Sequence, residues 1–543
     1  MKMDVLVVQT IASALIGFFV WFSYKRGWGD GIAISDRRAL VGILCASGLH
    51  FLVFSVLTSF RYLAMVPAAM DLGVYENTLW RVSHGEWVRL LESYTHTMPV
   101  LLFPALVYRL FPHPFTMLIL QSGAIGLSAY LAFRLARIHL PPFPAFVIGL
   151  AFLLHPGTSW LNLFDFHPDS FWPPLFLGAA IGLERGKKWA FLILGILLVL
   201  IKEPLALSGA ALGLYALWTN KARWQGFALI VLGILFFSLS VLWFIPALMD
   251  RTYPYYEAYR VFLPQHVPAK LVFLINILGP YAFVPLASPM ELISALPHAI
   301  ASLVSNNPTH FSIRYQYSAS LVPALTYALV FVLKKARRPS SLALGVLISS
   351  CLFHIFVSPS PLSYEFWAKH RSGYHFSRYI PDQRDREVTA FLESAIPKDP
   401  DVSVCISDQG GVYSSVIGRR WRMSIFPHGV GECDMVVVDT SGEPLLWGAF
   451  YPIEDEGAFR AELKRVSELY EPIGSCRGVV VYKRAKGVSG AGKPTGFGSS
   501  GRWRTDWIAP LLYTATYIVA SSTPSVFPGQ SHGGLFSANL SAH

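Results

Sequence analysis

Charged residues are scarce in this sequence of 543 residues. Asp, Glu, Lys and Arg together make up 14% of the chain, against about 25% in an ordinary globular protein. A soluble protein of this length could not cover its surface with so few charges. Cysteine is rare as well, and five cysteines, an odd number, define no disulfide framework. The composition therefore excludes an ordinary soluble globular protein, and the cysteines by themselves fix no disulfide.

Several familiar signatures are also missing. The N-terminal apolar run is followed by Tyr24-Lys25-Arg26 instead of a small-residue cleavage site, so it predicts a first membrane helix and no cleavable signal peptide. No internal repeat is visible. Residues 365–485 contain no glycine-rich phosphate loop, no dinucleotide-binding fingerprint and no nucleophile–base pair. Gly410-Gly411 is the nearest approach to such a loop and is typical of a turn.

The sequence contains long apolar runs, and 53% of its residues are hydrophobic. A helix needs roughly 18–20 apolar residues to cross a hydrocarbon core of ~30 Å, and several runs approach or exceed that length. Gly and Pro interrupt them, which favours helices over the short alternating strands of a β-barrel. The main runs cover residues 5–22, 40–60, 115–135, 227–248, 321–333 and 342–357.

The formal charge of +11 does not indicate a nucleic-acid partner, because the basic residues lie in short loops between apolar runs. Short loops rich in Lys and Arg mark the cytoplasmic side of a membrane. These loops carry Lys25 and Arg26, Arg37 and Arg38, Arg134 and Arg137, Arg185 to Lys188, Lys221 and Arg223, and Lys334 to Arg338.

Threading the chain between these loops predicts about 10–12 membrane crossings in residues 1–360. Residues 61–114 become an external loop, and everything after Pro359 lies outside the cell membrane. The legs on either side of Lys202-Glu203 are each only ~18–20 Å long, so we expect this pair to lie below the outer surface.

A different composition begins after the last apolar run, and residues 361–485 alternate predicted strands and helices. This alternation predicts a small soluble α/β domain on the extracytoplasmic side. Residues 486–543 are rich in Gly, Ser, Pro and Thr, which is typical of a disordered tail. The predicted elements are helices at 384–394 and 456–470 and strands at 402–407, 434–439 and 478–482.

Four polar clusters lie beside the apolar segments, where ionisable groups are costly. By the predicted topology all four face outward, and we expect them to converge at the external mouth of the bundle. Each also has an ordinary explanation, as a solvated loop residue, an interfacial histidine or an internal ion pair. The clusters are Arg61 with Asp71, His96 in HTMP, Asp165-Phe166-His167-Pro168-Asp169, and Lys202-Glu203.

The third cluster could bind a divalent cation such as Mg²⁺ or Mn²⁺ through Asp165, His167 and Asp169. Carboxylate oxygen and imidazole nitrogen are suitable ligands for such ions. Asp and His at an external turn are also ordinary loop residues, so the metal site stays one of two interpretations.

Several blocks resemble the membrane-protein family known as domain of unknown function 2079. MDLGVYENTLWRVSHGE resembles its Asp-Leu-Gly…Trp…Gly signature, and FDFHPDSFWPPL with VLIKEPLAL is similar to its His-Pro and Lys-Glu blocks. IRYQYSASLVPAL resembles a Tyr-His-Tyr…Pro block, with Gln316 in place of the expected histidine. The resemblance covers roughly residues 40–485.

This family in turn resembles the GT-C superfamily of membrane glycosyltransferases, which use a sugar donor linked to a polyprenyl phosphate. The resemblance implies a GT-C-like helical bundle with Asp71 as the catalytic carboxylate, acting as base toward an acceptor hydroxyl. It implies that cationic residues meet the leaving phosphate and that the external domain recognises a saccharide, lipid or protein acceptor. The residues assigned to substrate binding are Arg61, His96, Lys202, Glu203, Arg314, Gln316 and Tyr317.

Two other functions remain open from the residues alone. A transporter or flippase for a lipid or polar solute would use helices broken by proline, and such segments occur around Pro204, Pro280 and Pro297. A non-catalytic scaffold would display the external domain, and Gln316 favours it because an amide cannot titrate as a histidine does.

Overall fold

The computed structural model describes residues 3–67, 69–91, 95–249, 252–259, 265–370, 372–407, 418–441 and 456–485. The chain divides into two compact units, Met1–Val488 and Ser489–His543. The first unit holds all of the described residues. The tail predicted at residues 486–543 lies outside them, as does the turn predicted at Gly410-Gly411.

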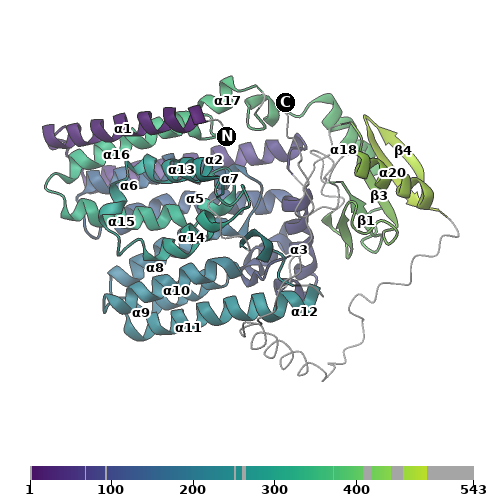
Figure 1. The fold of residues 1–543 in the computed structure, drawn as a ribbon, viewed down its shortest axis with the longest axis horizontal. Coiled ribbons are helices and arrows are strands. Elements are labelled where there is room, and N and C mark those ends of the chain that lie inside the picture. The colour runs from purple at the N-terminus through teal and green to yellow at the C-terminus, as the bar shows by residue number, and fades with distance from the viewer. Residues whose placement is uncertain are drawn as a thin grey trace, which may run out of the picture. The chain divides into compact units, whose positions relative to one another are not determined.

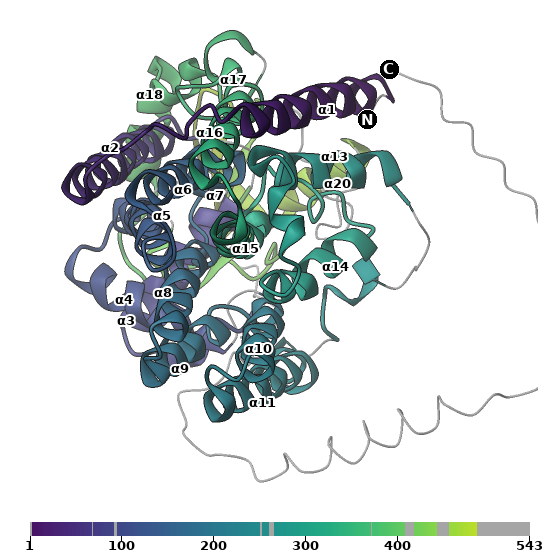
Figure 2. The same cartoon turned by 90° about the vertical axis from the view of Figure 1, so that its left-hand side faces the viewer.

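Long apolar helices form the body of the first unit (Figures 1 and 2). Within the described residues, six helices are long and apolar enough to cross a membrane, or seven if one bent pair counts as a single span. The protein is therefore a multi-pass helical membrane protein, as the sequence predicts. The six spans are formed by α1 (Met3–Arg26), α2 (Asp36–Leu63), α5 (Pro114–Ala136), α11 (Arg223–Leu239) with its continuation to Leu248, η10 (Gln316–Ser318) with α15 (Leu321–Lys335), and α16 (Pro339–Val357).

The remaining predicted crossings are short or bent helices. The helices α6 (Pro142–Leu154) and α7 (Pro156–Leu163) meet at an angle of 46°, because proline at residue 156 cannot continue the preceding helix. This explains why fewer helices reach spanning length than the 10–12 crossings predicted. The shorter helices of the bundle are α4 (Leu102–Leu110), α8 (Trp172–Glu184), α9 (Lys188–Val199), α10 (Glu203–Trp218), α13 (Val267–Leu278) and α14 (Leu296–Val304), whereas α12 (Ile245–Met249) belongs to the continuation of α11.

The break after α13 shows how the bundle tolerates irregular backbone. Its carbonyl groups at Gly279 and Pro280 accept hydrogen bonds from Ser349 Oγ at 2.7 Å and Ser350 Oγ at 2.8 Å on α16. Non-helical backbone at membrane depth is stable only where other protein groups satisfy it. The predicted break at Gly279-Pro280 is therefore stabilised by α16 rather than by water.

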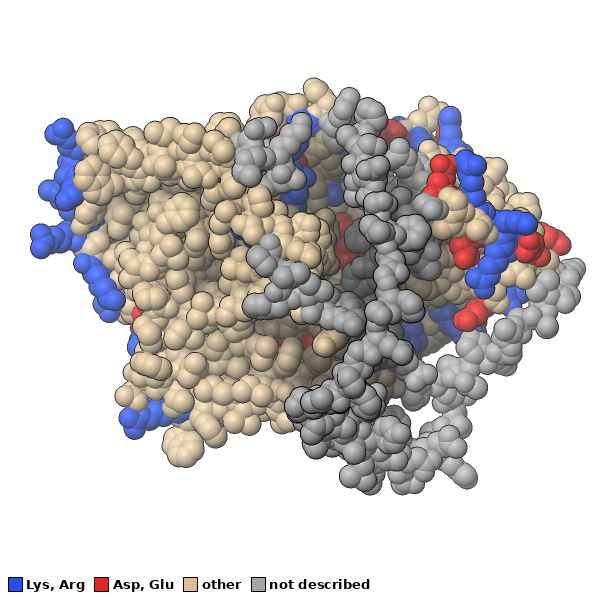
Figure 3. All heavy atoms as spheres, in the orientation of Figure 1, with Lys and Arg blue, Asp and Glu red and all other residues tan. Residues whose placement is uncertain are grey.

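The basic loops gather at one end of the bundle. Arg338 Nη1 at the start of α16 donates to the carbonyl of Lys25 at 2.6 Å, and Arg137 Nη2 lies 2.6 Å from Asp36 Oδ1. Figure 3 shows blue side chains at that end and a broad uncharged surface beside it. Apolar side chains on the membrane helices, among them Leu15 on α1 and Leu52 on α2, are exposed, as expected for helices that face lipid.

The extramembrane part after α16 contains a five-stranded sheet in the order β2-β1-β3-β5-β4. The pairs β1–β2 and β1–β3 are parallel, whereas β3–β5 and β4–β5 are antiparallel. Both predicted helices and all three predicted strands are present, and β2 and β4 are additional. The elements are α17 (Tyr364–Ala368), α18 (Gln383–Ala395), β1 (Val404–Ile406), β2 (Met423–Ile425), β3 (Met435–Asp439), α20 (Glu456–Leu469), β4 (Tyr470–Cys476) and β5 (Val479–Arg484).

Candidate functional site

Asp71 lies in a π-helical turn, η1 (Ala69–Gly73), that leads into α3 (Val74–Ser83). π-Helical turns are rare and occur often at functional sites. The carboxylate is partly open to solvent, with 28% of its side chain exposed. Asp71 therefore combines an unusual backbone position with access to a ligand.

His167 faces Asp71, with 3.4 Å between His167 Nε2 and Asp71 Oδ1, and the imidazole is almost fully buried. Gln121 on α5 holds the loop that carries His167. Its amide oxygen accepts from the His167 backbone N–H at 2.9 Å, and its amide nitrogen donates to the carbonyl of Asp165 at 2.8 Å. The Phe164 ring also stacks on His167 with 5.2 Å between ring centres. The imidazole is thus held in one orientation toward Asp71.

Lys202 is buried and pairs with Asp169. The distance between Lys202 Nζ and Asp169 Oδ2 is 3.7 Å, which is close enough for an ion pair and too long for a hydrogen bond. Both side chains are about 5% exposed, as expected for a Lys-Glu hairpin that lies below the outer surface. The Lys202 ammonium consequently keeps much of its hydrogen-bonding capacity for another group.

Glu203, the next residue, is fully satisfied. His96 Nδ1 donates to Glu203 Oε1 at 2.6 Å, the Thr97 N–H donates to Oε2 at 3.1 Å, and Tyr253 OH donates to Oε1 at 3.1 Å. Tyr255 OH donates in turn to His96 Nε2 at 2.8 Å. Burial lowers the pKa of His96, although Glu203 opposes that effect. This network favours a neutral imidazole and braces the site instead of offering free groups to it.

Tyr75 on α3 connects the two halves of the site. Burial raises the pKa of Tyr75 well above its usual value, and the negative charges of Asp169 and Asp71 raise it further. Its ring also meets the His167 ring edge-on, with 5.3 Å between centres. Asp71, His167, Asp169 and Lys202 therefore belong to one cluster, although they come from three separate segments of the chain.

Three buried polar atoms of the cluster have no hydrogen-bond partner among the residues that the structure describes. They are His167 Nδ1, Asp169 Oδ2 and Gln316 Oε1. Gln316 begins η10, which contacts η4 (Pro168–Phe171), the turn that carries Asp169. Buried polar groups are rarely left unpaired, and such atoms indicate where water or a ligand binds.

Arg61 and Arg314 do not point into this cluster. Arg61 Nη1 donates to the Gly373 carbonyl at 2.7 Å, and its guanidinium lies 4.3 Å from the centre of the Tyr374 ring. Arg314 donates to both oxygens of Glu365 at 3.2 and 3.3 Å. Both arginines thus hold the segment that follows α16. The predicted residue Tyr317 packs its ring against His310, with 4.8 Å between ring centres.

Asp165, His167 and Asp169 do not form a metal site in this arrangement. Asp165 has a left-handed backbone, with φ of 32°, and its charge acts on Tyr374, where burial is the main cause of a raised pKa. His167 turns to Asp71 and Asp169 turns to Lys202. Across the described part of the chain, no three His, Cys, Asp or Glu side chains are grouped to hold a metal ion. The three side chains therefore do not converge in this arrangement, and the divalent cation stays a prediction.

The C-terminal domain contacts α3, the helix that follows Asp71. Asn77 Nδ2 donates to the carbonyls of Gly418 at 2.9 Å and Arg420 at 2.6 Å. Arg419 Nε lies 3.4 Å from Glu76 Oε1, which also accepts from Tyr108 OH at 2.7 Å. Residues 418–420 of the domain are therefore in direct contact with the helix that follows Asp71.

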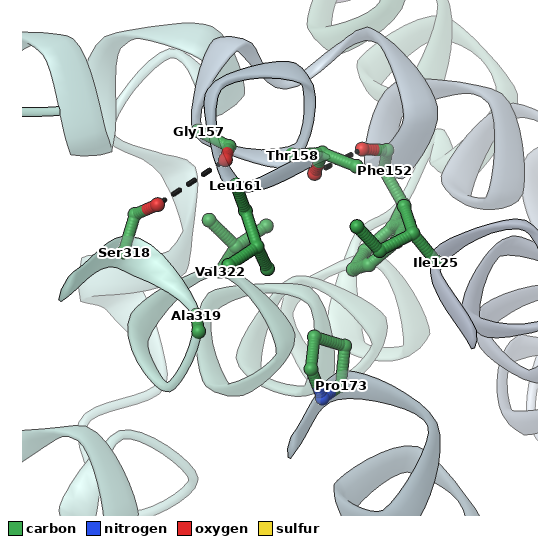
Figure 4. A pocket seen from close by; sticks show the side chains of 9 residues that line it. All are labelled: Ile125, Phe152, Gly157, Thr158, Leu161, Pro173, Ser318, Ala319 and Val322. Carbon is green, nitrogen blue, oxygen red and sulfur yellow. Dashed lines mark hydrogen bonds between the residues drawn. The ribbon is translucent and has the colours of Figure 1, made fainter. Parts of the chain in front are cut away.

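A small apolar pocket lies deeper in the bundle, between α7 and η10 (Figure 4). It has room for about one water molecule. Ser318 Oγ donates to the Gly157 carbonyl at 3.2 Å, and Thr158 Oγ1 donates to the Phe152 carbonyl at 2.8 Å. With its polar rim already bonded, the pocket is a packing defect and too small for a substrate.

Sequence reasoning missed three residues that shape the site: Gln121, Tyr75 and Tyr255. Gln121 carried a signal, since an amide in the middle of an apolar run is costly unless it is bonded. Tyr255 belongs to an aromatic-rich loop whose partner cannot be inferred from spacing. Tyr75 is adjacent in sequence to the signature residues but gives no separate signal.

Fold and site together define a multi-pass helical membrane protein with a buried, charged cluster at the end opposite its basic loops. The chain belongs to the family of predicted membrane proteins DUF2079, whose sequence pattern matches residues 61–403. No curated protein shows significant sequence similarity to it.

Solved structures similar to the chain include two of ArnT. ArnT from Cupriavidus metallidurans bound to undecaprenyl phosphate has a TM-score of 0.48 and 13% sequence identity, with 81% of this chain and 98% of that chain covered. ArnT from the same organism in the apo state has a TM-score of 0.47 and 14% identity, with coverage of 84% and 100%.

Proposed function

We propose that this protein transfers a sugar from a polyprenyl-phosphate donor to an acceptor hydroxyl on the extracytoplasmic side of the membrane. The observation that carries the proposal is that one cluster contains both a partly exposed carboxylate, Asp71, beside His167, and a buried, incompletely bonded ammonium, Lys202, beside Asp169. Sugar transfer from a phosphate needs both a base and a positive charge.

In the proposed reaction the acceptor hydroxyl oxygen forms a bond to the anomeric carbon of the sugar. The bond between that carbon and the phosphate oxygen breaks, and its electron pair leaves with the phosphate. Asp71 accepts the hydroxyl proton. His167, 3.4 Å from Asp71, keeps the carboxylate oriented toward the acceptor. Attack from the side opposite the leaving group inverts the configuration of the anomeric carbon.

Lys202 acts on the leaving group. Its ammonium is buried beside Asp169 at 3.7 Å and has hydrogen-bonding capacity to spare. In a water-poor site a fixed cation stabilises developing negative charge far more than it would in water. The unpaired oxygen of Gln316 can accept a hydrogen bond from a sugar hydroxyl, and an amide serves that role as well as a histidine does.

The test uses full-length protein in lipid nanodiscs with radiolabelled polyprenyl-phosphate sugars. We expect release of polyprenyl phosphate together with a labelled acceptor or free sugar, and Asp71→Asn should reduce the rate about 100- to 10,000-fold. Asp30→Asn is the matched control, because Asp30 pairs with Arg338 at the basic end of the bundle.

Two results would overturn the proposal. The first is full turnover by Asp71→Asn. The second is donor movement across a liposome membrane without any bond cleavage, which would identify a flippase. Loss of turnover by Asp30→Asn as severe as that by Asp71→Asn would also count against the assignment of Asp71.

A further inference from the structure

The segment of residues 361–380, which joins α16 to α18, exposes a run of large apolar side chains. Five of them are more than a third exposed: Leu362, Tyr364, Trp367, Phe376 and Ile380. Trp367 and Phe376 lie together, with 5.6 Å between ring centres. A contiguous apolar patch of this kind on a folded chain marks a contact surface.

The segment is folded and attached to the bundle. Its opposite side buries Phe366 and Tyr379, which pack with Phe54 of α2 and with Leu163. Trp367 Nε1 donates to the Pro361 carbonyl at 2.7 Å, and His375 Nε2 lies 3.2 Å from the Trp367 carbonyl. The exposure of the aromatic rings is therefore a property of an ordered surface, with the buried and exposed faces clearly separated.

The charge on the exposed side is positive. Glu365 is the one acidic residue in this stretch of sequence, and it is buried against Arg314 and Ser372. Lys369 and Arg378 are exposed, and Lys369 Nζ also forms a loose ion pair with Glu365 Oε2 at 3.8 Å. Aromatic rings, aliphatic side chains and cations on one face form the composition that proteins present to the headgroup region of a bilayer.

The position of the segment matches that composition. The helix α16 begins at the basic end of the bundle and ends at Val357, and α17 contacts it while η11 (Phe376–Tyr379) contacts α2 (Figure 1). Phe60 on α2 and Phe356 on α16 are exposed as well. The apolar patch therefore continues the lipid-facing surface of two membrane spans at the end where those spans leave the hydrocarbon core.

We propose that residues 361–380 form a membrane-interface anchor that inserts Trp367 and Phe376 among the lipid headgroups of the outer leaflet. Lys369 and Arg378 contact the lipid phosphates. The anchor is fastened to α2 by Arg61, whose guanidinium donates to the Gly373 carbonyl and lies against Tyr374. Since Arg61 directly precedes the loop that bears Asp71, the anchor fixes the height of that loop relative to the bilayer. The inference does not depend on sugar transfer.

Site-specific photocrosslinking in nanodiscs tests the anchor. The benzophenone amino acid p-benzoylphenylalanine replaces Trp367 in one variant and Phe376 in another. Leu52, exposed on α2, gives the positive control, and Arg460, exposed on α20 of the soluble domain, gives the negative control. We expect phospholipid adducts by mass spectrometry at 367, 376 and 52, with a yield at 460 at least tenfold lower.

Absence of lipid adducts at both 367 and 376, while position 52 yields them, would overturn the proposal. So would adducts at these two positions that contain a second protein in native membrane extracts. Two crosslinking positions guard against a single variant that folds poorly.

A second measurement tests whether Lys369 and Arg378 contact the lipid phosphates. The adduct yield at 367 should rise with the fraction of phosphatidylglycerol in the nanodisc, because anionic lipids concentrate at a positive surface. The double variant Lys369→Glu/Arg378→Glu should remove most of that rise. An unchanged dependence on phosphatidylglycerol would show that the two side chains do not face the lipid.

Discussion

Two buried polar clusters in the same bundle use similar side chains in different ways. At the basic end, Glu184 accepts from Lys221 Nζ at 2.5 Å and from Tyr327 OH, and its other oxygen lies 3.2 Å from His139 Nε2. At the opposite end, Lys202 and Asp169 are 3.7 Å apart and polar atoms are left unpaired.

The difference in bonding distinguishes a structural cluster from a candidate reaction site. A buried network whose members are all bonded rigidifies the fold, whereas a partly bonded one is costly and persists where a ligand completes it. The Glu184 cluster joins α8, α15 and the loop after α10, so we interpret it as a brace. The cluster of Asp71, His167, Asp169 and Lys202 is the one in which incomplete bonding leaves capacity for a substrate.

Among the variants that compare these two clusters directly, the largest expected effect contrasts two lysines. Lys202→Met should lower turnover about 100- to 1,000-fold, because a site loses roughly that much when one preorganised group that stabilises transition-state charge is removed. Lys221→Met should lower the unfolding temperature in nanodiscs and leave the turnover of the folded fraction unchanged. Turnover and thermal unfolding are measured on the same preparations.

Removing Lys202 also leaves Asp169 buried without its partner, which destabilises the protein by itself. The double variant Lys202→Met/Asp169→Asn controls for this effect, since a neutral amide needs no counter-charge. It should regain stability without regaining turnover. If it recovered turnover, Lys202 would be a structural residue like Lys221.

A smaller effect is expected when the brace is broken. Glu184→Gln leaves Lys221 without a counter-charge, and breaking a fully buried pair costs about 3–5 kcal/mol. The Lys221 side chain is 29% exposed, so we expect about 1–3 kcal/mol of lost stability after solvent screening. Thermal unfolding against wild type measures it. The half-exposed pair of Asp30 with Arg338 is the comparison, and Asp30→Asn should change stability by less than about 1 kcal/mol.

A further effect concerns pH and the contact between α3 and the C-terminal domain. Burial raises the pKa of Glu76 from 4.5 to about 7, although Arg419 opposes the rise. The folded protein therefore holds this proton more tightly than the unfolded chain does. The resulting stability is fully present below pH 4.5 and is lost as the pH rises through about 7.

Unfolding temperatures between pH 5 and pH 8 check this prediction. The free energy of unfolding of the wild type should fall by an amount on the order of 3 kcal/mol as the pH rises through this range. Glu76→Gln should remove this fall. The exposed residue Glu387, which pairs with Arg477, provides a control, and Glu387→Gln should retain the wild-type pH profile. Equal profiles for wild type and Glu76→Gln would show that Glu76 is ionised throughout.

Local sequence was enough to predict elements and their burial. Apolar runs long enough to cross a bilayer can only be helices in lipid. Residues 435–438 of β3 are apolar on both faces of the strand, so the sequence indicates a buried strand there. The short strand β2 and the edge strand β4 were missed, because a strand of three residues and a mostly exposed strand that contains Pro and Gly have weak sequence patterns.

The sequence was also enough to predict that the polar clusters share one end of the bundle. The basic loops set the direction of every helix, and this direction decides the side on which Asp71, His96, His167 and Lys202 lie. What each side chain contacts was decided by the tertiary structure. The backbone at Asp165 is left-handed, and Gln121 holds the loop that carries His167 by hydrogen bonds. As a result, the side chains of Asp165, His167 and Asp169 face three different partners. Arg61 and Arg314 were substrate-binding candidates from the sequence alone. In the structure both donate hydrogen bonds to the segment after α16. Membrane topology follows from the free energy of inserting each segment into the bilayer, and that free energy depends on the local sequence. Which side chains contact each other depends on their directions, and only the packed bundle defines those.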